Sequence, residues 1–291
     1  MLQFKHVQIP DGDLIQVRDG RLVVGPHPII GHLRGDGVGL DITPAMKLVV
    51  EAAVDKAYGG ERQIQWCPLY CGLEALQRYG EVLPQETVDA IAHLKVAIKG
   101  PFTTPIGEES HVCLHCAHQQ NSAASCEKCG RDDGVAPRFR SINAGLRQAL
   151  DLYACIRPIR YFEGVPAPNK YAKKVDFVIF RENTEDLYAG HDFEQGSSIS
   201  KAIIELVREQ TGRQIRLDSG LGIKSVSEFG TKRLVRTALR WAIGNRLSSV
   251  TLVHQGNIMK FTEGSFCKWG YEVTREEFGQ RTISEKKLYD E

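Results

Sequence analysis

Three arginines in the middle of the chain could together bind an anion. Arg147, Arg157 and Arg181 each carry a guanidinium that can hold a carboxylate through two parallel hydrogen bonds, so the set suits a ligand with several carboxylates. The apolar run at residues 96–98 stops at Lys99, as a buried strand does where it ends in a loop. Ligands of open α/β sheets bind at such carboxyl ends. The sequence therefore predicts an anion-binding active site between Lys99 and Arg181.

Spacing alone would also fit arginines on solvated faces, so the surrounding motifs decide between the two interpretations. These motifs are Thr103-Thr104-Pro105, Ser141-x-Asn143-x-x-x-Arg147, Asp151-Leu152-Tyr153, Arg157-Pro158, Arg181-Glu182-Asn183-x-Glu185-Asp186-x-Tyr188-Ala189-Gly190, Glu228-x-Gly230-Thr231-Lys232-Arg233 and residues 250–264. They closely resemble the isocitrate dehydrogenases of the β-decarboxylating dehydrogenase family, and the NADP-dependent bacterial type is nearest. The resemblance covers nearly the whole chain apart from one cysteine-rich insertion.

The resemblance implies oxidative decarboxylation of isocitrate to 2-oxoglutarate, with NADP and Mg²⁺ or Mn²⁺, in a homodimer. Such chemistry needs a base for the hydroxyl proton, a hydride acceptor and a cation beside the new carbonyl. By resemblance, Tyr188 delivers a proton to the enolate, although a core tyrosine with a satisfied hydroxyl stays open as an alternative. The resemblance also assigns residues that bind the substrate, namely Ser141, Asn143, Arg147, Arg157 and Arg181. It assigns residues that bind the cofactor as well, namely Lys99, Thr103, Thr104 and Asn257.

One catalytic position departs from the family pattern. The family reads His-Lys-Gly-Asn where this chain has His254-Gln255-Gly256-Asn257. A glutamine amide donates a hydrogen bond but carries no proton near neutral pH, so we expect Gln255 to lower or abolish turnover. The alternative function is therefore a catalytically silent, zinc-containing homologue that binds polycarboxylates or pairs with an intact subunit. A relative acting on 3-isopropylmalate fits less well, because Ser141-x-Asn143 suits a polar carboxylate better than an alkyl group.

A second departure concerns the end of the chain. The sequence stops at Asp290-Glu291, before the metal-binding aspartates and the adenosine-phosphate pocket that the resemblance would imply. We therefore expect a C-terminally truncated large domain and a fragment of a longer gene product. The choice between NAD and NADP cannot be read from the residues present.

Four cysteines form a cluster in the insertion at residues 108–139. Cys113-x-x-Cys116 and Cys126-x-x-Cys129 are nine residues apart, a spacing close to that of a small zinc ribbon, and Gly130 provides room for the turn. Two reducible disulfides and four inert thiols are the alternatives, and the nearby histidines His111, His115 and His118 are alternative ligands. Four cysteine ligands leave no open position for substrate, so we expect a structural Zn²⁺ that braces a loop beside the active site.

The composition is that of an ordinary globular protein. The chain has 291 residues, of which 42% are hydrophobic and 25% are charged, with a formal net charge of +1. So small a charge gives no global field for nucleic acid or an acidic membrane, and a small-molecule partner is expected. Because the N-terminus lacks an apolar signal region and no run of eighteen apolar residues occurs, the sequence predicts a cytoplasmic protein.

Alternating apolar runs and helical periods predict an α/β fold, similar to isocitrate/isopropylmalate dehydrogenases, with parallel strand pairing. The expected strands are 29–30, 64–67, 96–98, 177–180 and 250–253. One helix is expected after the glycine-rich loop 35–39, with Thr43 as its cap and Pro44 in its first turn. Three more are expected at 84–93, at 197–212 and from Ser227 to Gly244. We expect a large domain (1–152), a small domain (153–185 and 228–291) and a dimerisation clasp (186–227).

Overall fold

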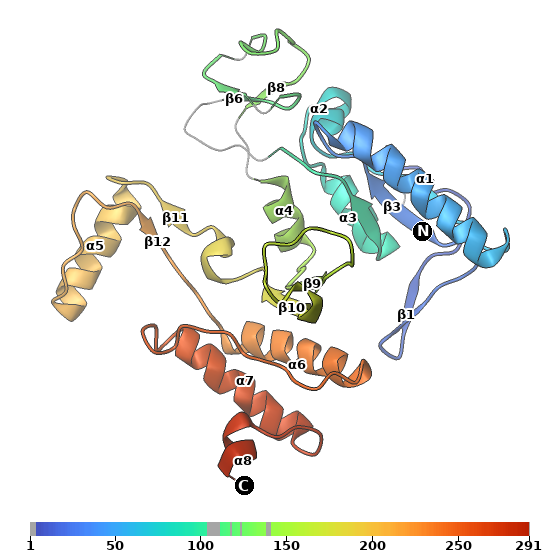
Figure 1. Ribbon diagram of the computed structural model, residues 1–291. Coiled ribbons are helices and arrows are strands. Elements are labelled where there is room, and N and C mark those ends of the chain that lie inside the picture. The colour runs from blue at the N-terminus through green and yellow to red at the C-terminus, as the bar shows by residue number, and fades with distance from the viewer. Residues whose placement is uncertain (1–3, 104–110, 117, 123, 138–140, 291) are drawn as a thin grey trace. The chain divides into compact units, whose positions relative to one another are not determined.

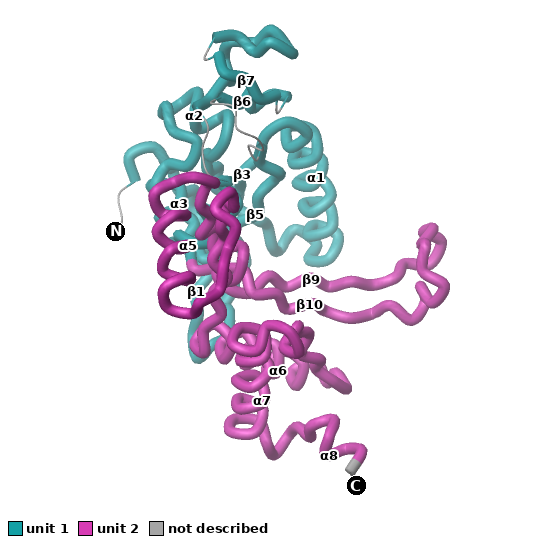
Figure 2. Tube along the Cα trace, turned by 90° about the vertical axis from the view of Figure 1, so that its left-hand side faces the viewer, with its two compact units in different colours: residues 1–150 teal, residues 151–291 magenta. Residues whose placement is uncertain are grey.

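The computed structural model describes residues 4–103, 111–116, 118–122, 124–137 and 141–290. It divides into two compact units, residues 1–150 and 151–291 (Figure 2). Each unit is described by itself below. Within the described residues, no helix is both long enough and apolar enough to cross a lipid bilayer.

Unit 1 is built on a three-stranded parallel sheet in the order β4-β3-β5, and Figure 1 labels its central strand β3. Its strands are β1 (Gln16–Arg18), β2 (Arg21–Val23), β3 (Ile29–Leu33), β4 (Gln65–Pro68) and β5 (Ala97–Lys99). Its helices are α1 (Gly39–Tyr58), α2 (Leu73–Tyr79), α3 (Gln85–Leu94) and α4 (Ile142–Ala149). Helices connect β3 to β4 and β4 to β5, which confirms the predicted α/β class.

The core of unit 1 lies around β3. Ile29 and Leu33 are buried, and they share one hydrophobic cluster with Leu69, Leu94 and Ile142. The cluster therefore joins the central strand to α3 and α4. This packing fixes the carboxyl ends of β3 and β5, from which the candidate site residues emerge.

The first helix begins earlier than the sequence suggested. α1 begins at Gly39. Its first turn is already closed by backbone hydrogen bonds, since the Gly39 N–H donates to the Asp36 carbonyl and the Ile42 N–H donates to the Val38 carbonyl. Thr43 is not its cap, because the Thr43 hydroxyl is turned back and donates to the Arg34 carbonyl at 2.7 Å. The glycine-rich loop itself starts the helix, a signal that capping rules based on side chains do not detect.

The cysteine-rich insertion forms a small antiparallel sheet in the order β7-β6-β8. Its strands are β6 (His111–Cys113), β7 (Gln119–Gln120) and β8 (Val135–Pro137). Val112, Leu114 and Ala136 are buried in one cluster with Leu73 of α2. We call residues 111–137 of this insertion, described except at positions 117 and 123, the knuckle.

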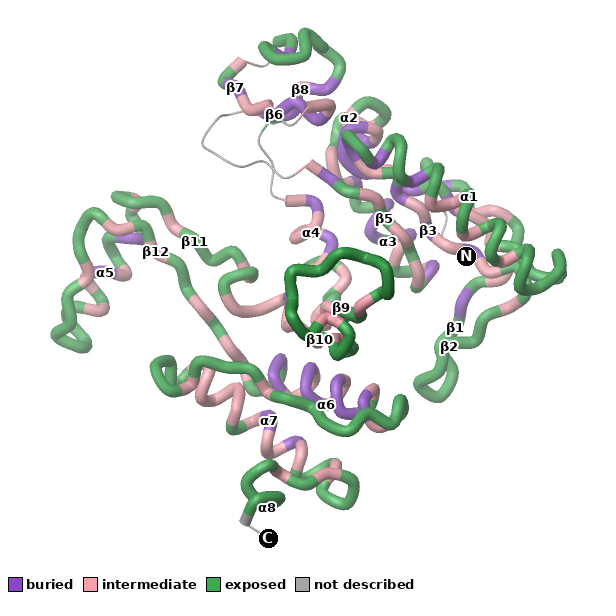
Figure 3. Tube along the Cα trace, viewed as in Figure 1, coloured by how far each residue is buried: buried purple, intermediate pink, exposed green. Residues whose placement is uncertain are grey.

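Unit 2 combines a two-stranded ribbon with a pair of long helices. The strands are β9 (Ala154–Arg160), β10 (Asp176–Glu182), β11 (Asp192–Phe193) and β12 (Leu221–Gly222). The helices are η1 (Ala172–Lys174), η2 (Asp186–Ala189), α5 (Ser198–Thr211), α6 (Glu228–Gly244), α7 (Glu263–Phe278) and α8 (Glu285–Asp290). Figure 3 shows the buried side of α6, where Val235 and Leu239 pack with Val273 of α7.

The two helices that the sequence predicted in unit 2 were confirmed as α5 and α6, whereas α7 was not predicted. Ser197 and Ser227 cap α5 and α6, and their hydroxyls accept hydrogen bonds from Ser200 and Gly230. Strand burial was predicted less well. Phe177 and Ile179 of β10 are 49% and 39% exposed, because β10 pairs only with β9 among the described strands.

The predicted strand at residues 250–253 was wrong. The segment has no regular secondary structure and no strand partner in the described part of the chain, and Val253 is 85% exposed. It lies with β10 and α6 around a cavity of about 650 Å³ that Phe180, Trp241 and Leu252 help to line. Apolar patterning therefore located the segment correctly but could not supply the neighbouring strand that a ladder needs.

Candidate functional site

In unit 1, three of the predicted substrate residues lie on or next to one short helix. Ser141 precedes α4, Asn143 lies in its first turn and Arg147 in its last. Ser141 occupies the N-cap position of α4, but its hydroxyl makes no capping hydrogen bond to the first turn of the helix. Backbone N–H groups in the first turn of a helix lack partners within the helix and favour an anion.

A second cation lies near Arg147. Lys99 ends β5, its ammonium donates to the Gly100 carbonyl at 3.1 Å, and it lies 5.3 Å from the Phe102 ring centroid. The pKa of Lys99 is lowered, first by partial desolvation and second by the positive charge of Arg147. Two cations that disfavour each other's charge are stabilised by an anion between them. Unit 1 thus has the electrostatics of an anion site at the end of β5.

The loop after β5 is held by a buried carboxylate that sequence reasoning missed. Asp36 is 4% exposed, and its two oxygens accept hydrogen bonds from the backbone N–H groups of Leu73 at 2.8 Å and Thr103 at 3.1 Å. Its own N–H donates to the Pro101 carbonyl at 2.7 Å. Burial raises the pKa of Asp36, and the two backbone donors oppose that rise. The predicted cofactor residue Thr104 lies outside the described residues.

The approach of this carboxylate requires a glycine in the neighbouring turn. Gly72 has φ +67°, and a Cβ added there would meet the Asp36 carboxylate oxygen at 2.4 Å. The acid within Gly35-Asp36-Gly37 was the available sequence signal, although it does not reveal that Leu73 and Thr103 are its partners.

In unit 2, Arg157 and Arg181 lie on one face of the β9–β10 ribbon. The register pairs Arg157 with Ile179 and Cys155 with Arg181. Because side chains alternate along a strand and directly paired residues share a face, the two arginines are diagonal neighbours. The opposite face carries Phe180, whose ring lies 5.6 Å from that of Trp241 on α6. The register therefore places the two arginines on the ribbon face opposite Phe180.

Tyr188 joins this face through Arg181. The Arg181 guanidinium lies 3.9 Å from the centroid of the Tyr188 ring, a cation–π contact, and Tyr188 is 56% exposed. Nη2 of Arg181 is buried and has no hydrogen-bond partner among the described residues. A buried guanidinium nitrogen without a partner is costly, and a ligand carboxylate would satisfy it. Both residues line a cavity of about 240 Å³ in unit 2.

Gln255 lies in a turn of the same unit. Its N–H donates to Glu263 Oε2 at 3.1 Å, and its carbonyl accepts from Ile258 and Met259. The side chains of Gln255 and Asn257 are exposed. The turn is thus fixed through its backbone, which leaves the amide of Gln255 available to a ligand.

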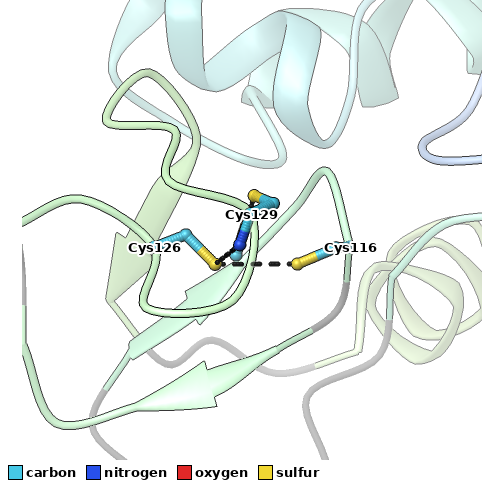
Figure 4. A group of neighbouring side chains, drawn as sticks. Cys116, Cys126 and Cys129 are labelled. Carbon is cyan, nitrogen blue, oxygen red and sulfur yellow. Dashed lines mark hydrogen bonds between the residues drawn. The ribbon is translucent and has the colours of Figure 1, made fainter.

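The four cysteines converge as the spacing predicted, and Figure 4 shows three of them, Cys116, Cys126 and Cys129. Their sulfur atoms all lie within 4.8 Å of one another, and no other group of three or more His, Cys, Asp or Glu residues within the described ranges could hold a metal ion. The Sγ atoms of Cys113 and Cys129 are 3.7 Å apart, and those of Cys116 and Cys126 are 3.6 Å apart. A tetrahedron with Zn–S bonds of about 2.3 Å places its sulfurs about 3.8 Å apart. Both distances fit a ZnS₄ centre and are far too long for a disulfide.

The thiols of the cluster differ in their electrostatics. Although burial opposes it, the backbone N–H groups of Cys129 and Lys128 help to lower the pKa of Cys126 to about 6, which favours a thiolate, whereas burial raises the pKa of Cys113 to about 12 and also raises that of Cys116. The sulfur geometry, rather than the charge, therefore supports a metal. His115 is engaged elsewhere. Its Nδ1 accepts from Arg131 at 3.2 Å, so its Nε2–H donates to Asp133 at 3.0 Å.

Comparison with known proteins agrees with the motifs. Residues 29–290 match the isocitrate/isopropylmalate dehydrogenase family. The chain is 44% identical to an isocitrate dehydrogenase [NADP] of Archaeoglobus fulgidus over 290 residues, covering 99% of this chain and 63% of that protein. It is 49% identical to an isocitrate dehydrogenase [NADP] of Pseudomonas aeruginosa over 287 residues, covering 96% and 62%.

A solved structure gives the same result for the fold. The crystal structure of isocitrate dehydrogenase from Methylococcus capsulatus matches with a TM-score of 0.61 and 31% identity, covering 87% of this chain and 58% of that chain. The chain spans about three fifths of the length of these relatives. Because the family match covers residues 29–290 and the relatives from Archaeoglobus fulgidus and Pseudomonas aeruginosa are 44% and 49% identical over nearly the whole chain, the chain belongs to the isocitrate/isopropylmalate dehydrogenase family.

Proposed function

We propose that the protein converts isocitrate to 2-oxoglutarate by oxidative decarboxylation, with NADP as the hydride acceptor. The observation that carries this proposal is the buried, unpartnered Nη2 of Arg181, which lies against the Tyr188 ring on the ribbon face that also carries Arg157. A carboxylate of the substrate fills that position. The relatives that are named as NADP-dependent isocitrate dehydrogenases support the same choice of substrate.

Each predicted residue has a definite task in this proposal. Ser141, Asn143 and Arg147 bind the remaining carboxylates through the hydroxyl, the amide and the guanidinium. Tyr188 holds the proton that the enolate receives after carbon dioxide leaves. The nicotinamide lies near Thr103 and Thr104, with Lys99 and Asn257 as further polar partners of NADP.

The proposal also includes Mg²⁺ or Mn²⁺, which polarises the new carbonyl in such chemistry. These ions prefer several oxygen ligands. The described residues do not group three carboxylates in one place, so they do not fit such an ion.

Gln255 bears on a second candidate function, a silent homologue that binds polycarboxylates or pairs with an intact subunit, because its amide cannot carry a proton. The relatives named as isocitrate dehydrogenases [NADP] do not favour this alternative. The two functions differ in turnover but share isocitrate binding. A binding measurement therefore tests the common part first, and turnover then separates them.

Isothermal titration with isocitrate tests the binding site. Arg157→Ala is expected to weaken binding by about 2 to 4 kcal/mol, because one substrate carboxylate loses a bidentate partner. The matched control is Arg160→Ala, three residues along the same strand, where the guanidinium is exposed and lies 3.8 Å from Asp176. Equal affinity in Arg157→Ala and the parent would remove Arg157 from the site.

We also propose that the knuckle holds one structural Zn²⁺ through Cys113, Cys116, Cys126 and Cys129. The sulfur spacing described above supports this, and four thiolate ligands close the coordination shell. Metal analysis of purified protein is expected to give about one zinc per chain, lost in Cys126→Ser and retained in the control Cys267→Ser. Metal-free parent protein with an ordered knuckle would contradict the proposal.

The remaining proposals concern assembly and location. Residues 186–227 form the dimerisation clasp, residues 1–152 the large domain, and residues 153–185 with 228–291 the small domain. The protein acts as a cytoplasmic homodimer. Light scattering of the parent and of a variant lacking α5 tests the clasp, since loss of the dimer is expected only if this segment joins two copies.

A further inference from the structure

A single lysine in unit 2 connects the two turns that carry Tyr188 and Gln255. Nζ of Lys224 lies 2.6 Å from Asp186 Oδ1 and 2.7 Å from Glu263 Oε1. Its side chain is only 20% exposed, so both ion pairs are shielded from solvent. Lys224 is not among the residues assigned to substrate, cofactor or proton transfer.

The first carboxylate belongs to the turn of Tyr188. Asp186 begins η2 with φ +66°, a left-handed conformation that is unfavourable for a residue with a Cβ. Three interactions hold it there. Its N–H donates to the Ser225 carbonyl at 2.9 Å, its Oδ1 accepts the Leu187 N–H at 2.8 Å, and the same oxygen pairs with Lys224. Tyr188 follows two residues later, so its backbone direction depends on this strained residue.

The second carboxylate belongs to the turn of Gln255. Glu263 begins α7 and is half-buried. Its Oε1 pairs with Lys224, while its Oε2 accepts the Gln255 N–H at 3.1 Å. The lysine thereby holds the carboxylate that fixes the Gln255 backbone.

We propose that Lys224 is a positioning residue for two turns at once. Through Asp186 it holds the turn that presents Tyr188 for proton transfer, and through Glu263 it holds the turn that presents the Gln255 amide to a ligand. Charge supports this role. Although burial opposes the charged form, hydrogen bonds to Asp186 and Glu263 raise the pKa of Lys224, and the Lys224 ammonium lowers the pKa of Glu263. Lys224 therefore stays a fixed cation and does not itself replace the missing proton carrier.

Amide hydrogen exchange of the whole chain, followed by NMR without ligand, tests the proposal. Lys224→Met keeps the length of the side chain but removes its charge. Exchange of the Leu187 and Gln255 amides is expected to become at least about tenfold faster together, because each donates to a carboxylate that has lost its cation. Lys224→Arg keeps the charge and is expected to restore both amides.

The chain offers a closely matched control. Lys232 is 23% exposed and also bridges two carboxylates, Glu228 at 2.6 Å and Glu272 at 3.2 Å, but neither contacts the two turns. Lys232→Met should leave the Leu187 and Gln255 amides unchanged. Unchanged exchange in Lys224→Met, a change at only one amide, or an equal effect of Lys232→Met would overturn the proposal.

The role of Lys224 rests on the proposed function only in that the proposed function gives Tyr188 and Gln255 their parts in the reaction. Where isocitrate is turned over, Lys224→Met is expected to lower kcat at least tenfold while KM for isocitrate changes less than about threefold. Failure of isocitrate to bind the parent would refute the proposed function and leave the exchange result standing. Failure of the exchange experiment would refute the role of Lys224 and leave isocitrate binding untouched.

Discussion

Replacement of Asp36 by alanine is expected to destabilise unit 1 strongly. The change leaves the N–H groups of Leu73 and Thr103 without their acceptor in a buried site. An unsatisfied buried donor costs about 1 to 3 kcal/mol, so two cost about 2 to 6 kcal/mol. Part of this is offset because the variant no longer buries a carboxylate, whose pKa burial raises. We therefore expect a loss of about 2 to 4 kcal/mol in the free energy of unfolding.

Urea unfolding followed by indole NMR measures this loss separately in unit 1. The Trp66 indole nitrogen donates to Glu51 at 2.7 Å, so its signal reports on unit 1, whereas Trp241 and Trp269 belong to unit 2. Asp55→Ala on the exposed side of α1 is the control, with an expected change within about 0.5 kcal/mol. A loss for Asp36→Ala no larger than that of the control would refute the reasoning.

The same site gives a pH dependence of known sign. The pKa of Asp36 in the folded state lies above its ordinary value of 3.8, so the folded chain binds this proton more tightly than the unfolded chain. The contribution to stability is therefore greatest below that value and falls as pH rises through the folded-state pKa. Asp36→Asn removes the titration. As pH rises, the free energy of unfolding of the parent is expected to fall relative to that of Asp36→Asn. A difference between the two that does not change with pH would contradict the assignment.

Three further substitutions test other parts of the structure. Gln255→Lys is expected to raise kcat by up to about 10²- to 10⁴-fold with little change in isocitrate affinity, and steady-state kinetics would show equal turnover if another group moves the proton. Leu114→Ala, at a fully buried position in the knuckle, is expected to cost about 2 to 5 kcal/mol in urea unfolding, and an effect below about 1 kcal/mol would argue against the shared core with α2. Ser227→Ala removes the cap of α6 and is expected to cost about 0.5 to 2 kcal/mol in urea unfolding followed by the Trp241 indole signal, with Ser227→Asn as the variant that restores it.

Local signals in the sequence predicted local structure well. Ser227 caps the helix that its position suggested, and each Cys-x-x-Cys pair lies in a turn, as its spacing suggested. The two pairs meet through the pairing of β6 with β7 and β8, which is not a local signal. The α/β class follows from alternating strand and helix periods, which depend on neighbours a few residues apart. Motif resemblance added the candidate site residues, and among these the register of β9 and β10 brings Arg157 and Arg181 to one face.

Contacts between distant residues could not be predicted in the same way. Asp36 accepts hydrogen bonds from residues 37 and 67 positions away, and no local pattern identifies those donors. No local pattern distinguishes Lys224 from the other lysines, because its two partners, Asp186 and Glu263, are 38 and 39 positions away in the sequence. Residues 250–253 show the converse case, because apolar runs identify a strand only where another strand is present to pair with it.

The position of Leu73 determines whether the knuckle is a removable module. Insertions in surface loops are usually tolerated and can often be deleted without harm to the host domain. Here the Leu73 side chain belongs to the knuckle's hydrophobic cluster, while its N–H donates to Asp36, whose other oxygen holds Thr103. Excision of the knuckle would expose a leucine at the start of α2 and loosen the loop after β5. The insertion has thus become part of the host domain's own architecture, and a protein engineered without it would need a new partner for Leu73.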